Sequence, residues 1–240
     1  MALEWQVFLQ DDGSGRTYGA WMIDAWGWTL SVAACAWCVA MVVGTAVGVL
    51  RTLEGRPLWV RLGNAWVELF RNIPLLVQIF IWYFVCPKFF PAMQHWPGFV
   101  LVVLALGFFT SARVAEQLRA GIQALPKGQR YAAKAMGFNT VQTYRYVLLP
   151  TAFRIIFPPL TSETMNLLKN SSVAFAVSIA ELTMFAMQAQ EETSRGIEIY
   201  LAVTLLYAGS ALAVNRAMAW AERRMSIPGL NAASHNQAGH

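Results

Sequence analysis

The sequence predicts an all-α integral membrane protein with five transmembrane helices. Of its 240 residues, 57% are hydrophobic and only 13% are charged, and the mean hydropathy is +0.43. A soluble domain is about 45–50% apolar and about 25% charged, so this chain has too little polar surface for a water-soluble globule. The same composition excludes a disordered chain, a collagen and a disulfide scaffold. Five apolar runs are long enough to cross the roughly 30 Å hydrocarbon core of a bilayer.

The predicted spans cover about Trp26–Leu50, Ile73–Phe90, Gly98–Leu118, Ala152–Ala176 and Ile199–Ala219. In the first span, Gly44 and Gly48 form a small-xxx-small pair that lets another helix approach closely. In the fourth span, Pro158 and Pro159 remove two backbone donors, which predicts a kinked or broken helix.

Charge predicts the orientation of the chain in the membrane. Fourteen of the 18 Lys and Arg residues lie between spans one and two, between or flanking spans three and four, or after span five. Since basic residues favour the cytoplasmic side, we expect the N-terminus outside and the C-terminus inside. Residues 1–20 then form a periplasmic segment without a cleaved signal peptide, because they have neither a basic start nor a short apolar core. Residues 21–225 form the five-span domain, and residues 226–240 are predicted to be a disordered cytoplasmic tail.

Between spans one and two, residues Pro57–Asn72 have the pattern of an amphipathic helix. Apolar side chains recur there at helical spacing, namely Leu58, Trp59, Leu62, Trp66, Leu69 and Phe70. We expect this helix to lie in the inner membrane interface and to lead into span two.

The cytoplasmic loop of residues 119–150 predicts two short helices. In the first, Ala132, Ala133 and Met136 form a small face, and Gly137 ends the helix. The second begins at about Thr140, carries Tyr144, Val147 and Leu148, and ends where Pro150 opens the next span. A compact helix–glycine–helix knob suits a groove on a partner protein. A helical hairpin resting on the membrane surface is the alternative.

Span four carries polar groups that are costly inside a membrane unless they are functional or paired. Glu163, Asn166 and Asn170 recur at i, i+3 and i+7 and share one helix face, and Lys169 lies off it, followed by Ser171 and Ser172. These residues are the predicted substrate pathway. In the alternative interpretation, Glu163 and Lys169 neutralise each other or line a subunit interface.

Other groups favour structural roles. Arg113, Glu116 and Arg119 are predicted to be interface anchors with an intrahelical ion pair. Cys35 and Cys38 are expected to be small apolar side chains of span one, and no metal site is predicted. No catalytic residues are predicted, because the histidines are few and no phosphate-binding loop is present. Tryptophans near the span ends form an aromatic belt rather than a platform for nucleic acid.

Two rival classes lack support in these residues. A membrane-embedded enzyme needs a constellation of catalytic groups at one membrane face. A membrane assembly or sensory subunit without a transport path does not need Glu163, Asn166 and Lys169 in a broken span.

The order Ala132-Ala133, Gly137 and Leu149-Pro150 resembles the coupling motif, or EAA loop, of ATP-binding-cassette (ABC) importer permeases. The polar amino-acid branch of that family is similar in further segments, namely Glu68–Leu75, Ala115–Ile122, Leu125–Gln129, Pro158–Leu160 and Leu167–Ser172. The resemblance covers about Trp26–Arg224. Trp5, Phe8-Leu9-Gln10 and Thr17-Tyr18 resemble the start of one of the two permeases of glutamate/aspartate importers.

The resemblance implies a type I ABC importer permease fold (MetI-like) in the bacterial inner membrane. It implies three kinds of partner: a second, sister permease, a cytoplasmic ATPase dimer that alone binds ATP and Mg²⁺, and a periplasmic amino-acid-binding protein. This chain would hold no cofactor. The implied substrate is glutamate or aspartate, with Lys169 pairing with a carboxylate and Glu163 with the α-ammonium group; another polar amino acid such as glutamine is the alternative. The implied ATPase-coupling residues are Tyr131, Ala132, Ala133, Met136 and Gly137, although Tyr131 stands where the motif usually has Glu.

Overall fold

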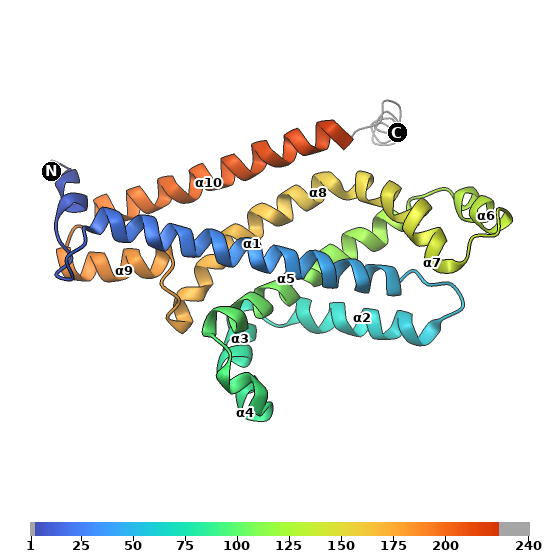
Figure 1. The fold of residues 1–240 in the computed structure, drawn as a ribbon, viewed down its shortest axis with the longest axis horizontal. Helices are drawn as coiled ribbons and strands as arrows, with labels where there is room; N and C mark the ends of the chain where they lie inside the picture. Colours follow the sequence, from blue (N-terminus) through green and yellow to red (C-terminus); the bar gives the residue numbers. More distant parts are fainter. Residues whose placement is uncertain (1–2, 226–240) are drawn as a thin grey trace.

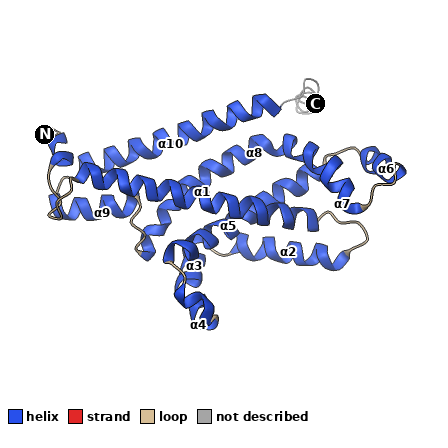
Figure 2. Cartoon of the chain, in the orientation of Figure 1, coloured by secondary structure: helices blue, strands red, loops and turns tan. Residues whose placement is uncertain are grey.

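The structure is a computed structural model that describes residues 3–225. Over this range the chain is helical, apart from short connections and one isolated bridge between Asp11 and Thr17 (Figure 2). The long helices run lengthwise through an elongated bundle (Figure 1). The predicted disordered tail, residues 226–240, lies outside the described residues.

Three helices are each long and apolar enough to cross a membrane: α1 (Tyr18–Leu50), α5 (Gly98–Gln123) and α10 (Gly196–Met225). They confirm predicted spans one, three and five. Each is longer than predicted, because the helical pattern continues into polar residues beyond the apolar run. The 33 residues of α1 span about 50 Å, which exceeds the hydrocarbon thickness.

Helices α1 and α5 approach closely at small residues. A Cβ atom on Gly44 would lie 2.6 Å from Cβ of Val114, and one on Gly48 would lie 3.0 Å from Cβ of Leu118. The separation at Gly44 is too short for a methyl group unless the helices move, and the one at Gly48 requires its neighbours to shift by a few tenths of an ångström. The predicted small-xxx-small contact is therefore confirmed, and α5 is its partner.

Helix α2 (Pro57–Asn72) has the bounds that its amphipathic pattern predicts. Its buried residues Val67 and Phe70 pack among side chains of α1 and α5, and the indole of Trp66 donates to Ser111 Oγ at 3.1 Å. Leu58, Trp59, Leu62 and Leu69 stay exposed. Part of the apolar face that we assigned to the membrane interface is thus covered by protein, and α2 runs beside α1 (Figure 1).

The second predicted span, Ile73–Phe90, corresponds to one helical run made of α3 (Leu75–Phe80), a π turn (Ile81–Val85) and α4 (Cys86–Phe89). This run is bent by 105° from α2. The bend follows Ile73, whose extended backbone precedes Pro74, as expected for a residue before proline. A short 3₁₀ helix, Pro91–His95, then leads to α5. In Figure 1, α3 and α4 project away from the long axis.

The break in the fourth span is not at the prolines. Helix α8 (Leu149–Asn170) continues through Pro158 and Pro159, which is possible because the φ of proline is itself helical. The α-helix ends instead at Asn170, where the chain tightens into a 3₁₀ helix (Ser171–Val177). Ser178 then adopts a left-handed φ of 60°.

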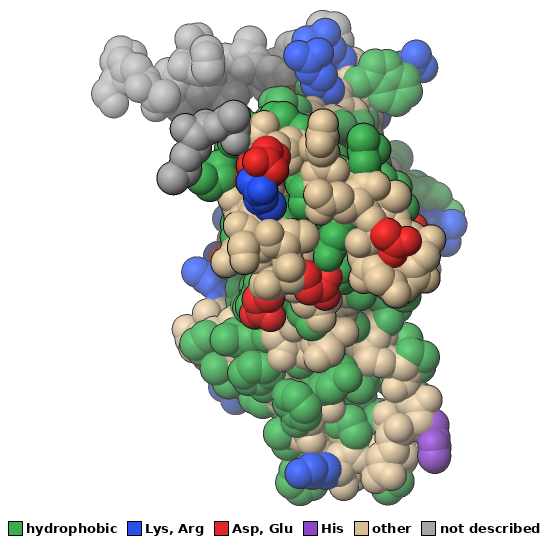
Figure 3. Space-filling view, turned by 90° about the vertical axis from the view of Figure 1, so that its left-hand side faces the viewer, with side chains coloured by type: hydrophobic (Ala, Val, Ile, Leu, Met, Phe, Trp, Pro, Cys, Tyr) green, Lys and Arg blue, Asp and Glu red, His purple; other side chains and the backbone are tan. Residues whose placement is uncertain are grey.

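Beyond this break lies α9 (Leu182–Thr193), which the sequence did not predict and which is bent by 53° from the preceding helical run. Leu182 and Phe185 on its buried face pack in one cluster with side chains of α1 and α10, among them Ile199 of α10. The N-terminal 3₁₀ helix (Trp5–Leu9) lies at the same end of the molecule. Figure 3 views this end, where acidic side chains stand out on the surface. We call it the acidic end.

Candidate functional site

The opposite end of the bundle carries α6 (Lys127–Ala135), α7 (Thr140–Thr143) and a π turn (Tyr144–Leu148), which leads into α8 (Figure 1). We call residues 127–148 the coupling segment. The two short helices confirm the predicted helix–glycine–helix arrangement. The second helix does not end before the span, however, because the π turn continues into α8 and places Pro150 in its first turn.

Gly137 ends α6 as predicted. It has a φ of +82°, and its N–H donates to the carbonyl of Lys134 while that of Phe138 donates to Ala133. This pair of bonds is a Schellman motif, which requires a left-handed residue at the glycine position. The next helix begins with a capping box between Asn139 and Gln142. Both turns of the coupling segment are therefore set by local sequence.

The predicted coupling residues do not share one exposed face. Tyr131 is 61% exposed and Met136 66% exposed, and Ala132 and Gly137 are also exposed. Ala133 is only 1% exposed, so it packs the knob and is not available on its surface. Two apolar side chains that sequence reasoning missed enlarge the exposed surface, namely Val141 and Tyr146.

A carboxylate from outside the coupling segment contacts α6. Glu54, in the connection between α1 and α2, forms ion pairs with Arg130 and, at 3.1 Å, with Lys134. Hydrogen bonds from Arg130 and then Lys134 lower the pKa of Glu54 below its ordinary value of 4.5. Sequence reasoning missed Glu54, because its two partners lie far along the chain.

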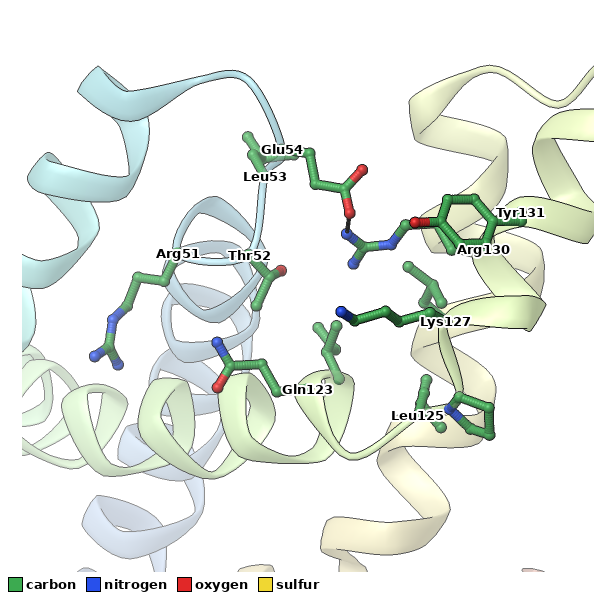
Figure 4. A pocket seen from close by; sticks show the side chains of 12 residues that line it. Arg51, Thr52, Leu53, Glu54, Gln123, Leu125, Lys127, Arg130 and Tyr131 are labelled. Atoms are coloured by element: carbon green, nitrogen blue, oxygen red, sulfur yellow. Dashed lines mark hydrogen bonds and ion pairs between the residues drawn. The ribbon is translucent and has the colours of Figure 1, made fainter.

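A second bond joins the same connection to the coupling segment. The hydroxyl of Tyr144, a buried residue, donates to the carbonyl of Thr52 at 2.7 Å. The Arg130 guanidinium lies over the Tyr144 ring, 5.8 Å from its centroid. Between these elements and the end of α5 is a cavity of about 360 Å³, into which Lys127 and Gln123 extend (Figure 4).

The polar end of α8 is the second part of the candidate site. Glu163 lies in an ion pair with Arg113 of α5, with a nitrogen–oxygen distance of 3.5 Å. The hypothesis that Glu163 and Lys169 neutralise each other is therefore wrong, because the partner of Glu163 comes from another helix. The guanidinium of Arg113 also lies 4.6 Å from the centroid of the Phe109 ring. Arg113, which we interpreted as an interface anchor, thus joins α5 to α8.

The remaining residues of the predicted pathway differ in accessibility. Asn166 and Asn170 are half-buried, whereas Lys169 is exposed and has no ion pair within residues 3–225. Ser171 is fully buried and donates to the carbonyl of Leu168 at 2.7 Å. Ser172 donates to the carbonyl of Lys169. Lys169 is therefore the cationic residue of this group, and its side chain is exposed. Ser171 stabilises the turn of the chain after α8.

Glu116 has more partners than the predicted intrahelical pair. It does pair with Arg119, but its other oxygen lies 2.7 Å from Arg51 at the end of α1 and 4.0 Å from Arg71 of α2. The Arg51 side chain is only 9% exposed, and it also donates to Asn64 of α2 at 2.8 Å. One carboxylate thus joins three helices.

A buried acid at the other end was also missed. Glu181 is 0% exposed and caps α9 by accepting the backbone N–H groups of Thr183 and Met184. It accepts the hydroxyl of Tyr207 from α10 at 2.8 Å, and the neighbouring N–H of Leu182 donates to Thr29 of α1. An acidic residue directly before an apolar helical run is a capping signal that could have located α9.

The part of the chain that the structure describes contains no group of three His, Cys, Asp or Glu residues able to hold a metal ion. Cys35 and Cys38 are free thiols on the exposed side of α1.

Together, the long apolar helices, the bent helix pairs and the protruding coupling segment define a helical membrane protein. The chain belongs to the family of binding-protein-dependent transport system inner membrane components, which matches residues 24–227.

Its relatives include the glutamate/aspartate import permease protein GltJ of Escherichia coli K12, which is 42% identical over 94% of this chain and 96% of the relative. The probable glutamine ABC transporter permease protein GlnM of Bacillus subtilis is 36% identical over 85% of this chain and 92% of the relative. A crystal structure of an amino acid ABC transporter with histidines superposes with a TM-score of 0.77 at 28% identity, covering 93% of this chain and all of that chain. The inward-facing MetNI methionine ABC transporter shares the fold at 19% identity, with a TM-score of 0.74 over 91% of this chain and all of that chain.

Proposed function

We propose that this chain is a permease subunit of an ATP-driven ABC importer that moves glutamate or aspartate across the bacterial inner membrane by alternating access. The observation that carries the proposal is the 42% identity to a glutamate/aspartate import permease over 94% of the chain. The exposed coupling segment supports it, because a permease needs a surface through which a separate motor can act.

In this proposal a cytoplasmic ATPase dimer binds ATP and Mg²⁺ and contacts the coupling segment. The surface of the coupling segment that contacts the ATPase consists of the exposed side chains of Tyr131, Ala132 and Met136, together with Val141. Apolar and aromatic side chains that protrude from a polar rim are typical of an interface core. Ala133 and Gly137 act indirectly, by holding the shape of the knob.

The same arrangement supports one orientation in the membrane. The coupling segment and the C-terminal end of α10 lie at one end of the bundle, and the N-terminal segment and α9 lie at the other (Figure 1). The basic residues between the spans favour the coupling end as cytoplasmic. The acidic end then faces the periplasm and receives the amino-acid-binding protein, and a sister permease completes the pathway.

Within this subunit, Lys169 is the residue best suited to pair with a carboxylate of the substrate. It is exposed, it has no ion pair in the described range, and the half-buried Asn166 and Asn170 lie close by along the helix. Glu163 contacts the α-ammonium group in this proposal only if Arg113 moves away, because Arg113 faces it in this conformation. Ser171 and Ser172 position the chain beyond Lys169 through their bonds to the backbone.

Import of glutamine is the second candidate. It is favoured by the 36% identity to the Bacillus subtilis relative and by the 30% identity to the glutamine transport system permease protein GlnP of Escherichia coli K12. Both substrates carry an α-carboxylate, but only glutamate and aspartate carry a second carboxylate on the side chain. Lys169 therefore separates the two candidates only if it pairs with the side-chain carboxylate, because the side chain of glutamine is a neutral amide.

The test is transport by the reconstituted complex. The chain is co-expressed with its sister permease and ATPase, placed in proteoliposomes that enclose ATP, and supplied with the binding protein. We expect uptake of labelled aspartate and glutamate that depends on ATP. Uptake of glutamine alone would replace the proposed substrate, and failure of the ATPase to co-purify would overturn the importer assignment. A thermal-shift screen of the binding protein against the amino acids provides an independent measure of specificity.

A further inference from the structure

Glu54 lies in the short connection between α1 and α2, and the ion pairs that the structure describes for α6 all end on its carboxylate. We propose that Glu54 is a positioning residue that ties the coupling segment to the inner end of α1, so that a movement of α6 reaches α1 and α2 as well as α5 and α8, to which α6 is joined along the chain. This inference rests on the proposed function, in which a separate ATPase moves α6.

The geometry favours a specific contact between Glu54 and α6 over a chance contact between surface side chains. Arg130 and Lys134 are four residues apart, so they lie on one face of α6, and both point to the same carboxylate. Gly55, next to Glu54, has a φ of +69°, which turns the chain sharply before Pro57 opens α2. The turn presents the Glu54 side chain to α6.

Few other contacts hold α6 in place. Ala133 is the buried residue of this helix, and the chain leaves it through Gly137 at one end and Pro126 at the other. The covalent paths from its two ends lead to α5, through residues 124–126, and to α8, through the second helix. Without the Glu54 carboxylate, the described contacts that carry a displacement of α6 to α1 run through Tyr144, which lies against Arg130, bonds to Thr52 and belongs to the apolar cluster against which Leu53 packs.

The connection passes the movement onward. Arg51, three residues before Glu54, donates to Glu116 of α5 at 2.7 Å and to Asn64 of α2 at 2.8 Å. A continuous set of polar contacts therefore runs from α6 through Glu54 and the backbone of residues 51–54 to two further helices. Coupling of this kind requires physical contact between elements that move together.

The exposure of the pair determines the size of its effect. The Glu54 side chain is 58% exposed and that of Arg130 is 19% exposed, so water and salt weaken the attraction. Such a contact contributes little to folding. We therefore expect loss of Glu54 to leave the protein folded and assembled, and to change the ratio of ATP hydrolysed to substrate transported.

The experiment compares Glu54→Gln with wild type in the full complex in proteoliposomes, with ATP hydrolysis and aspartate uptake measured together. We expect about two- to fivefold more ATP hydrolysed per aspartate transported in Glu54→Gln, with ATPase co-purification unchanged. Glu54→Asp, which keeps the charge, should return the ratio toward the wild-type value. Raising the ionic strength should increase the ratio of wild type and leave that of Glu54→Gln nearly constant.

Glu68→Gln is the matched control, because Glu68 is an exposed acid of α2 without an ion pair in the described range. An unchanged ratio in Glu54→Gln, or an equal change in Glu68→Gln, would overturn the inference. Loss of the ATPase from the Glu54→Gln complex would also overturn it, since Glu54 would then serve binding. If the wild-type complex itself neither holds the ATPase nor transports, the proposed function fails instead.

Discussion

The guanidinium of Arg51, at the C-terminal end of α1, lies 2.7 Å from Glu116 Oε2 in the C-terminal part of a neighbouring helix, α5. Because the Arg51 side chain is only 9% exposed, its charge depends on this carboxylate for compensation. The pair fixes the C-terminal parts of two long apolar helices relative to each other, in the same region where the coupling segment meets the bundle.

Glu116→Gln should therefore destabilise the protein. Loss of the charge leaves Arg51 poorly compensated, and we expect the free energy of unfolding to fall by about 1–3 kcal/mol. Thermal unfolding of the detergent-solubilised protein measures the effect. Glu68→Gln provides the control for loss of an acidic side chain at the same end, and an equal shift in both variants would contradict the role of the pair.

Gly44→Ala should disturb the contact between α1 and α5. The added methyl group would lie 2.6 Å from Val114 Cβ and 2.9 Å from the carbonyl oxygen of Ser111, so the helices would have to move apart. We expect a loss of about 1–3 kcal/mol in unfolding free energy. Gly27→Ala is the control, because no atom lies within 4 Å of its new methyl group. It should be neutral or stabilising, since alanine favours the helix.

Gly137→Ala should weaken the turn of the coupling segment. No atom lies within 4 Å of the added methyl group, so the cost comes from the φ of +82° alone, about 1–2 kcal/mol. We expect faster amide hydrogen exchange in residues 127–138 and less ATPase co-purified. Gly128→Ala, at an uncrowded helical position of α6, should not increase exchange. Equal behaviour of the two variants would exclude the Schellman turn as the cause.

Lys169→Met should reduce aspartate uptake about tenfold or more if the ammonium group pairs with a substrate carboxylate, since hydrogen bonds to charged groups are the strongest of their kind. The measurement is ATP-dependent uptake in proteoliposomes with intact binding protein, after assembly has been verified. Lys88→Met, at the end of α4, controls for the loss of a lysine. Unchanged uptake in Lys169→Met would remove this residue from the pathway.

The contact of Glu54 with α6 should weaken in acidic solution and should not change at higher pH. Its pKa is lowered in the folded state by Arg130 and then Lys134, so the contact is fully formed above the ordinary value of 4.5 and weakens as pH falls through the lower folded value. Spin labels attached at pH 7 to cysteines introduced at positions 53 and 131, with the native cysteines replaced, can report the distance between the two segments. We expect a constant distance between the labels from pH 8 to about pH 5 and a longer one in more acidic buffer. An increase that begins near neutral pH would point to another group.

Local patterns predicted the parts of the fold that depend on local physics. Helices α1, α5 and α10 follow from apolar length, and the bounds of α2 follow from its helical periodicity. Gly137 and its left-handed turn follow from the known preference of a helix end. These features depend on residues within one or two turns of each other.

The errors concern features that distant residues decide. Pro158 and Pro159 indicated a break, but the α-helix ends at Asn170 instead. Farther along the chain, Glu181 accepts hydrogen bonds from the backbone of α9 and from the hydroxyl of Tyr207 in α10. The pairing of Glu163 with Arg113 joins two helices and has no signature in spacing along either one. Ala133 was placed on the exposed face by its spacing, and only the packing of α6 shows that it is buried.

The hydrogen-bond network around Glu181 has a consequence for how the helices assemble. Its hydroxyl partner Tyr207 belongs to α10, and Thr29, which accepts from the neighbouring N–H of Leu182, belongs to α1. Until α10 is in place, Glu181 lacks the Tyr207 hydroxyl and keeps the two backbone N–H groups of α9 as donors, and an acid without its remaining partner is costly in a lipid environment. Assembly of this end of the bundle is therefore complete only when α1, α9 and α10 have come together.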